Sequence, residues 1–252
     1  MKKYIIAAML LIMGMGAFAQ DFTDGAGTHH FGFNIGFTDP ILREKNTKEQ
    51  EKFTNYKLPG LKAGLVYETS FVKGLGMQLG LNYTFGTKQG KELGGNAAGT
   101  TFKTKEDWFI HQLELPIDLQ YKFEVAKQTY LVLYTGPTVE MGIGFSKNYT
   151  SKKLNTSTGK IEESVSKLNL YDRMNTTSAD PDNDGIADHY QRFNLTWGVG
   201  AGLQYQRYYL RGGYDFGIFN PYSDRYNNIT DFRRIGRLDQ WSLKLGIYLW
   251  NF

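Results

Sequence analysis

The sequence has 252 residues and no cysteine, so the chain is not one of the small secreted folds that depend on disulfides. The formal net charge is only +4 and no basic patch stands out, so we expect no nucleic-acid partner. Aromatic residues make up 15% of the chain and glycine contributes 29 residues, whereas proline contributes only 6. This composition favours β-strands over disorder, and the length suits a single all-β domain.

The first 19 residues have the layout of a secretory signal peptide. Lys2 and Lys3 precede an apolar run that ends at Ala17-Phe18-Ala19, an A-x-A cleavage site. The run has roughly 14 residues, which is shorter than the ~20 residues that a membrane-spanning helix needs. We therefore expect cleavage before Gln20, with a signal peptide over 1–19 and a single mature domain over 20–252.

Eight stretches alternate between apolar and polar residues with the period of two that is typical of a β-strand. They are residues 29–37, 61–71, 74–86, 109–123, 129–145, 192–206, 209–219 and 240–250. In 192–206 the apolar set includes Trp197 and Leu203, whereas the interleaved set contains glycine, asparagine, threonine and glutamine. The polar side of this strand therefore faces a crowded polar space, and the bulky apolar side faces outward.

The polar side of the other stretches carries nine charged residues. They are Lys62, Glu68, Glu114, Asp118, Lys122, Glu140, Arg211, Asp215 and Lys244. A Lys or Arg facing lipid at the midplane costs about 2–4 kcal/mol, and the apolar cavity of a soluble lipocalin-type barrel would leave each charge without a partner. A polar lumen inside a lipid-facing shell accommodates both sides. The near balance of charge favours ion pairs that fill the lumen over the one-sign ring of a selective pore.

Long and short connections alternate along the chain. Residues 39–59, 87–107, 146–190 and 220–239 are predicted to be long loops, and they are separated by short turns at 71–74, 124–128 and Arg207. External loops are long and periplasmic turns are short in outer-membrane barrels. We therefore predict an all-β fold, an eight-stranded antiparallel up-and-down transmembrane β-barrel. It is expected to be a monomer surrounded by the outer-membrane lipid of a Gram-negative bacterium.

Three stretches carry a resemblance to a known family. They are LELPIDLQYKF (113–123), TGPTVEMGIG (135–144) and YLRGGYDFGIFN (209–220). The chain resembles the PorT-like outer-membrane β-barrel family over nearly its whole mature length. The resemblance implies the fold and the location, and the family's name suggests a link to secretion, but no catalytic role follows. Pro116 matches the family's proline, and because proline cannot donate a ladder hydrogen bond, we expect a bulge there.

The function that the sequence favours is a structural or surface-interaction role through the long external loops, with periplasmic or surface proteins as partners. A narrow channel or transport component is the first alternative, and an accessory of protein secretion is the second. We expect no enzyme, because no serine or second acid can be given a catalytic role beside Asp188 and His189. The other histidines lack the spacing of a zinc site or a catalytic triad.

The stretch ADPDNDGIADHYQ (179–191) resembles a calcium loop. Asp180, Asp182 and Asp184 take positions one, three and five, the carbonyl of Ile186 takes position seven and Asp188 position nine. Gln191 stands at position twelve, where an EF-hand has a bidentate carboxylate. The sequence therefore leaves two interpretations open, a weak calcium site with a Kd of about 10⁻⁴–10⁻³ M or a solvated acidic turn. No other cofactor is expected.

Replacing both Asp180 and Asp184 with Asn should abolish calcium binding, because each replacement removes one carboxylate from a site that already lacks the twelfth ligand. The barrel should stay intact, since the loop is expected to lie outside the membrane. Calorimetric titration of detergent-solubilised wild type and double variant with millimolar calcium measures the difference. Equal heats for the two proteins would leave only the acidic turn.

Overall fold

The computed structural model describes residues 27–46, 54–97, 100–155, 161–171, 190–222 and 234–251. Its strands are β1 (His29–Asn46), β2 (Thr54–Lys57), β3 (Gly60–Val72), β4 (Leu75–Gln89), β5 (Leu93–Ala97), β6 (Thr100–Ala126), β7 (Thr129–Asn155), β8 (Ile161–Asn169), β9 (Phe193–Tyr205), β10 (Tyr208–Gly217) and β11 (Arg234–Asn251). Within these residues, no helix is both long enough and apolar enough to cross a membrane.

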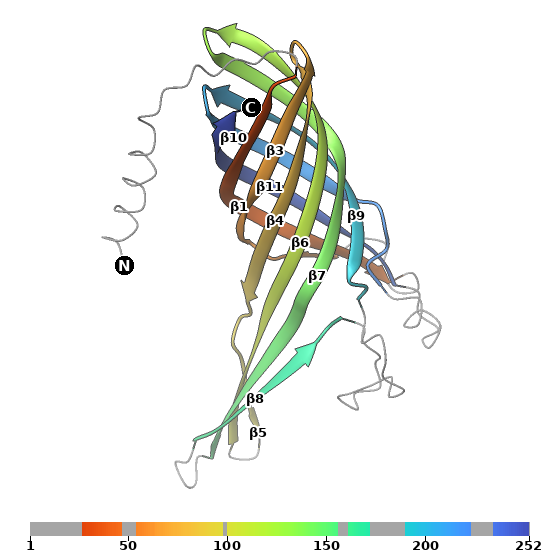
Figure 1. Cartoon of the computed structure of the whole chain (residues 1–252). Helices are drawn as coiled ribbons and strands as arrows, with labels where there is room; N and C mark the ends of the chain where they lie inside the picture. Colours follow the sequence, from red (N-terminus) through yellow and green to blue (C-terminus); the bar gives the residue numbers. More distant parts are fainter. Residues whose placement is uncertain are drawn as a thin grey trace, which may run out of the picture.

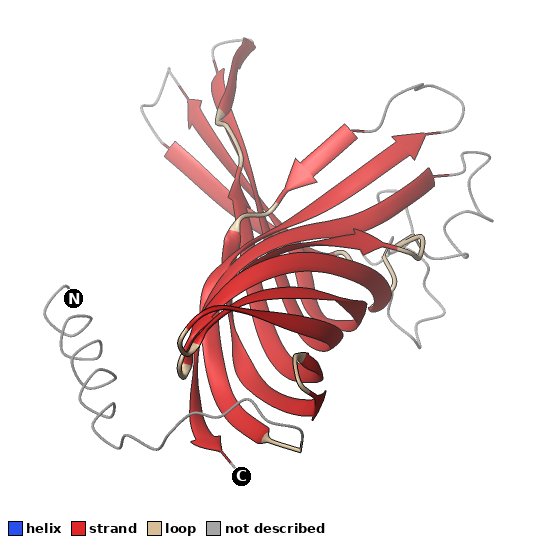
Figure 2. Cartoon of the chain, turned by 90° about the horizontal axis from the view of Figure 1, so that it is seen from above, coloured by secondary structure: helices blue, strands red, loops and turns tan. Residues whose placement is uncertain are grey.

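Eight of the strands close into a ring of antiparallel neighbours, in the order β1-β3-β4-β6-β7-β9-β10-β11 (Figures 1 and 2). The ring closes where β1 pairs with β11 from His30↔Asn251 to Asn46↔Arg234. The predicted eight-stranded up-and-down barrel is therefore confirmed. Short turns join β3 to β4, β6 to β7 and β9 to β10 at the end of the barrel that holds His29 and Asn251, which marks the periplasmic end.

The predicted outward and inward directions of the side chains in the barrel wall are confirmed. Trp197 and Leu203 point outward with exposed fractions of 47% and 55%. Eight of the nine predicted lumen charges are buried, and Asp215 is half-buried. The alternation of the sequence thus separates a lipid-facing shell from a polar interior.

The wall extends much further outward than the sequence predicted. Strands β6 and β7 each have 27 residues, whereas about 9–11 residues cross a bilayer. Parts of 87–107 and 146–190, predicted as loops, instead belong to β5, β8 and the outer ends of β6 and β7. Likewise β1, β2 and β11 enter the predicted loops 39–59 and 220–239. The sheet β5-β6-β7-β8 continues the wall away from the barrel (Figure 1); we call it the external sheet.

The prediction of a bulge at Pro116 is wrong. Pro116 causes no bulge, because the register of β6 against both β4 and β7 is the same before and after it, although pairs beside it are missing. Its ring instead packs against Gly80, where no side chain competes for the space. Tyr134, on the same side of β7 as Glu140, is buried in the lumen, where its ring packs against Gly200 and Gly213.

Replacing Val199 with Arg should impair barrel assembly, because Val199 lies midway along β9 and faces outward. The expected cost is about 2–4 kcal/mol near the bilayer midplane, against about 0–1 kcal/mol for Tyr205→Arg on the same side at the periplasmic end. Urea unfolding of the barrel in lipid vesicles measures both variants. Equal stability of the two variants would contradict the lipid-facing assignment of Val199.

Candidate functional site

Arg211 on β10 is the centre of the periplasmic layer of the lumen. Its guanidinium donates hydrogen bonds to Oε1 of Gln78 at 2.7 Å and to Oε1 of Gln120 at 2.6 Å. It also forms an ion pair with Oε2 of Glu68 at 3.2 Å. Because these partners come from β3, β4 and β6, a single side chain joins one wall of the barrel to the opposite one.

Glu68 is fully buried and collects further donors. Lys122 forms an ion pair with one of its carboxylate oxygens, and the hydroxyl of Tyr248 donates to the other. A buried carboxylate is costly unless charge and hydrogen bonds compensate it. The two cations and the hydroxyl provide this compensation, so the periplasmic layer is a network in which each charge depends on the others.

Glycines of β9 and β10 make room for this layer. The ring of Tyr134 lies so close to Gly200 and Gly213 that a Cβ at either position would overlap it. The guanidinium of Arg211 in turn lies 5.4 Å from the centroid of this ring, in a cation–π arrangement. The small residues on the polar side of 192–206 therefore face side chains of neighbouring strands and not an open channel.

Glu114 holds a second layer, further from the periplasm along β6. Its carboxylate pairs with Nζ of Lys62 at 2.6 Å and accepts hydrogen bonds from Thr84 at 2.5 Å and Gln240 at 3.2 Å. On the neighbouring strands β7 and β9, Glu140 accepts a hydrogen bond from Asn194 at 2.8 Å.

The space left inside this second layer is very small. The cavity has a volume of about 10 Å³ and is lined by Lys62, Asn82, Glu114, Pro116, Asp118, Tyr134, Thr138, Asp215, Ser242 and Lys244. A cavity needs about 10–15 Å³ to hold one water molecule. The charged lumen is therefore filled by its own side chains at this level.

An apolar cluster closes the external end of the barrel, and we call it the external lid. Its buried members are Leu42, Leu58, Ile110, Phe145, Leu170, Tyr171, Tyr190, Tyr222 and Leu238. Bridges from Tyr171 to Tyr190 and from Tyr190 to Tyr222 hold the loop segments together over the mouth. The alternating pattern does not predict this lid, because the tyrosines of the lid lie outside the stretches that indicate strands.

Polar contacts fasten the external lid to the rim. Burial, together with the nearby Tyr190 and Glu44, raises the pKa of Tyr222, whose hydroxyl donates to the Glu44 carboxylate.

Arg43 and Arg237 lie opposite each other in the β1–β11 ladder, and Nε of each pairs with Asp239, at 2.6 and 3.1 Å. Asp239 thus compensates a repulsion between like charges at the seam of the barrel.

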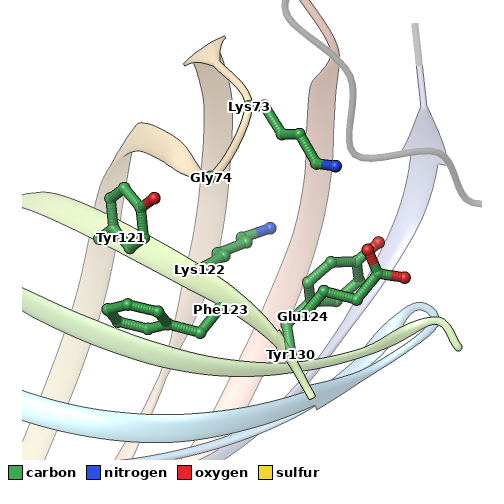
Figure 3. A pocket seen from close by; sticks show the side chains of 7 residues that line it. All are labelled: Lys73, Gly74, Tyr121, Lys122, Phe123, Glu124 and Tyr130. Carbon is green, nitrogen blue, oxygen red and sulfur yellow. The ribbon is translucent and has the colours of Figure 1, made fainter. Parts of the chain in front are cut away.

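A pocket of about 310 Å³ opens at the periplasmic end of the barrel. Figure 3 shows Lys73 from the β3–β4 turn, Lys122 and Glu124 from β6, and Tyr130 from β7 around this space. Because ammonium and carboxylate groups are mixed here, the pocket has no single preference for anions or cations. Lys122 is already paired with Glu68, which ties one wall of the pocket to the lumen network.

The external sheet carries charged side chains of both signs, which form weak ion pairs near its two edges. Lys103 pairs with Glu92 and Lys152 pairs with Glu163, both at 3.4 Å and with about half of each side chain exposed. Such exposed pairs contribute about 0–1 kcal/mol each. The sheet ends at β5 on one side and at β8 on the other.

The residues predicted to bind calcium lie outside the described residues. They are Asp180, Asp182, Asp184, Ile186 and Asp188. In the described part of the chain, no three His, Asp or Glu side chains come together as a metal site.

The family profile described as outer membrane protein beta-barrel domain matches residues 18–223, which is more than half of the chain. The chain belongs to this family. It is therefore an outer-membrane barrel of a Gram-negative bacterium, in agreement with the closed ring and its apolar outer surface. No curated protein sequence matches it.

Solved outer-membrane proteins show a distant similarity to this barrel. Ail of Yersinia pestis, in complex with the heparin analogue sucrose octasulfate, is 12% identical, with 90% of this chain and 99% of that chain covered and a TM-score of 0.35. OprG from Pseudomonas aeruginosa is 10% identical, with 91% and 98% covered and a TM-score of 0.45. Neisserial surface protein A is 11% identical, with 85% and 96% covered and a TM-score of 0.34. Because these scores lie below 0.5, the assignment rests on the family match and the closed ring.

Replacing Glu68 with Gln should destabilise the barrel strongly, because Arg211 and Lys122 would lose the carboxylate that they share inside the lumen. Breaking a buried pair costs about 3–5 kcal/mol. Glu92→Gln, which removes an exposed pair with Lys103, should cost about 0–1 kcal/mol. Denaturant unfolding in the same detergent compares the two variants. If Glu68→Gln is no more damaging than Glu92→Gln, the lumen network is not a main source of stability.

Proposed function

We propose that this outer-membrane barrel is a non-conducting surface-interaction protein, which presents the external sheet to partners outside the cell. The filled lumen carries the proposal. The layer around Glu114 leaves a cavity of only about 10 Å³, Arg211 bonds across the barrel in the other layer, and the external lid covers the outer mouth. What the barrel offers to the outside is then a surface and not a passage.

The external sheet is the surface that this proposal favours. It continues the wall on strands of 27 residues, so its partners reach it without entering the membrane. It presents charged groups of both signs together with exposed Leu93, Ile161 and Val165. Charged groups beside exposed apolar residues suit recognition of a protein surface better than of an ion or a small solute.

An accessory role in secretion stays a second proposal, supported by the resemblance of 113–123, 135–144 and 209–220 to the PorT-like family. Such a role would place the partner at the periplasmic end, beside the pocket that holds Lys73 and Glu124. Weak calcium binding by Asp180, Asp182, Asp184, Ile186 and Asp188 is likewise a proposal, and it rests on the sequence alone.

A photo-crosslinking residue placed in intact cells at Lys103, on the external sheet, should capture a protein partner. The same residue at Lys127, in the exposed periplasmic turn between β6 and β7, is the matched control and should capture none. Capture at position 127 alone would contradict the surface role and favour the accessory of secretion.

Planar-bilayer recordings of the purified wild-type barrel are the second arm of this test. They should show no ion-conducting steps, because the side chains of the lumen are bonded to one another across the barrel. Steady conductance would favour the channel instead, whichever position captures a partner.

A further inference from the structure

Strand β8 (Ile161–Asn169) is a long and open edge of the external sheet. In the described part of the chain it pairs with β7 alone, and its first seven residues are all exposed. It contains neither proline nor glycine, whereas β5 at the other edge has only five residues, two of them glycine. Such an edge is ready to pair with a further strand, because its outer N–H and C=O groups have no ladder partner among the strands that the structure describes.

The sequence of β8 is complementary to itself when two copies run antiparallel. If Val165 lies opposite Val165 of a second copy, Glu163 lies opposite Lys167 and Lys167 lies opposite Glu163, all on one side of the sheet. All nine residues are paired in this register.

Shifting the two copies by two or four residues keeps the same side of each strand facing the same way but gives less favourable side-chain pairs. A shift by two residues in either direction leaves Glu163 or Lys167 opposite Val165, and a shift by four brings Glu163 or Lys167 opposite its own copy. Since like charges directly opposite each other are destabilising, one register is preferred over the others.

We infer that β8 is a homotypic docking strand, through which two copies of this protein join their external sheets into one continuous antiparallel sheet. This deepens the proposed surface role by naming a second copy as the partner, and it replaces the monomer expected from the sequence. Val165, with 65% of its surface exposed, is covered at the twofold axis. Glu163 already pairs with Lys152 of its own chain, but half of its side chain is exposed and accepts a second ammonium group.

The symmetry of this pair also fixes how the two barrels face. Antiparallel copies of one strand are related by a twofold axis perpendicular to their common sheet. Two barrels can stand upright in one membrane only if that axis is the membrane normal, which would require the sheet to lie flat on the membrane. Because the external sheet continues the barrel wall outward, the pair joins barrels in two facing membranes (Figure 1).

Cysteine substitution tests the register directly, since the chain has no native cysteine. Residues directly opposite in an antiparallel pair have Cα atoms about 4.5–5.5 Å apart, within the ~4.4–6.8 Å that a disulfide spans. Under mild oxidation of the full chain in detergent, Val165→Cys should give a disulfide-linked dimer. Leu93→Cys, equally exposed but on β5, is the matched control and should stay monomeric. No excess of dimer over this control would overturn the inference.

Charge reversal tests the pairing between membranes. Glu163→Lys alone and Lys167→Glu alone each place like charges opposite each other twice, so the dissociation constant of each variant should rise about tenfold or more. Mixing the two variants restores opposite charges at both places. Vesicles that carry one variant should therefore not cluster, whereas a mixture of the two vesicle populations should cluster as wild-type vesicles do. Clustering that ignores these charges would overturn the inference.

The outcome for the proposed surface role is separate. Capture of a different protein at position 103, together with no dimer from Val165→Cys, would leave the surface role standing and remove the homotypic strand. Absence of both would remove the two proposals together.

Discussion

The pairing of β1 with β11 is the interaction on which the rest of the structure depends. A bilayer offers no partner for backbone N–H and C=O groups, so a sheet is stable there only when its first and last strands meet. The ladder from His30↔Asn251 to Asn46↔Arg234 provides this closure over the full height of the wall. At its outer end the seam brings Arg43 opposite Arg237, and Asp239 is the residue that makes this pairing tolerable.

Closing a ring of eight strands has a direct consequence for the interior. A barrel of this size has a lumen that side chains can fill, and polar side chains on the inner surface must then bond to one another. Arg211 shows the result, because its guanidinium reaches partners on β3, β4 and β6 at once. The lumen therefore behaves as a polar core, and its charges serve stability in the way that apolar side chains do in a soluble domain.

The sequence was sufficient for the parts of the fold that follow from a period of two. Alternation alone placed Trp197 outside, and the nine charges inside followed from the cost of a charge in lipid. It was not sufficient where a strand is exposed to water on both sides, as in the outer part of β6 and β7, because polar residues then occupy both sides and resemble a loop. The packing inside the lumen depends on residues far apart in the sequence, as the ring of Tyr134 shows, because Gly200 and Gly213 of neighbouring strands leave the space that it fills.

Outside the membrane the chain meets two physical problems. Strands that leave the ring have an unpaired edge, and apolar side chains at the outer mouth of the barrel are exposed to water. At the mouth, Tyr171, Tyr190 and Tyr222 pack with one another over the lumen, which removes their rings from water. At the sheet edges, β5 is short and contains glycine, whereas β8 is long and regular and has no strand on its outer side among the described residues. Because the outer edge of β8 is open in the described part of the chain, another strand can pair there without breaking a ladder that these residues form.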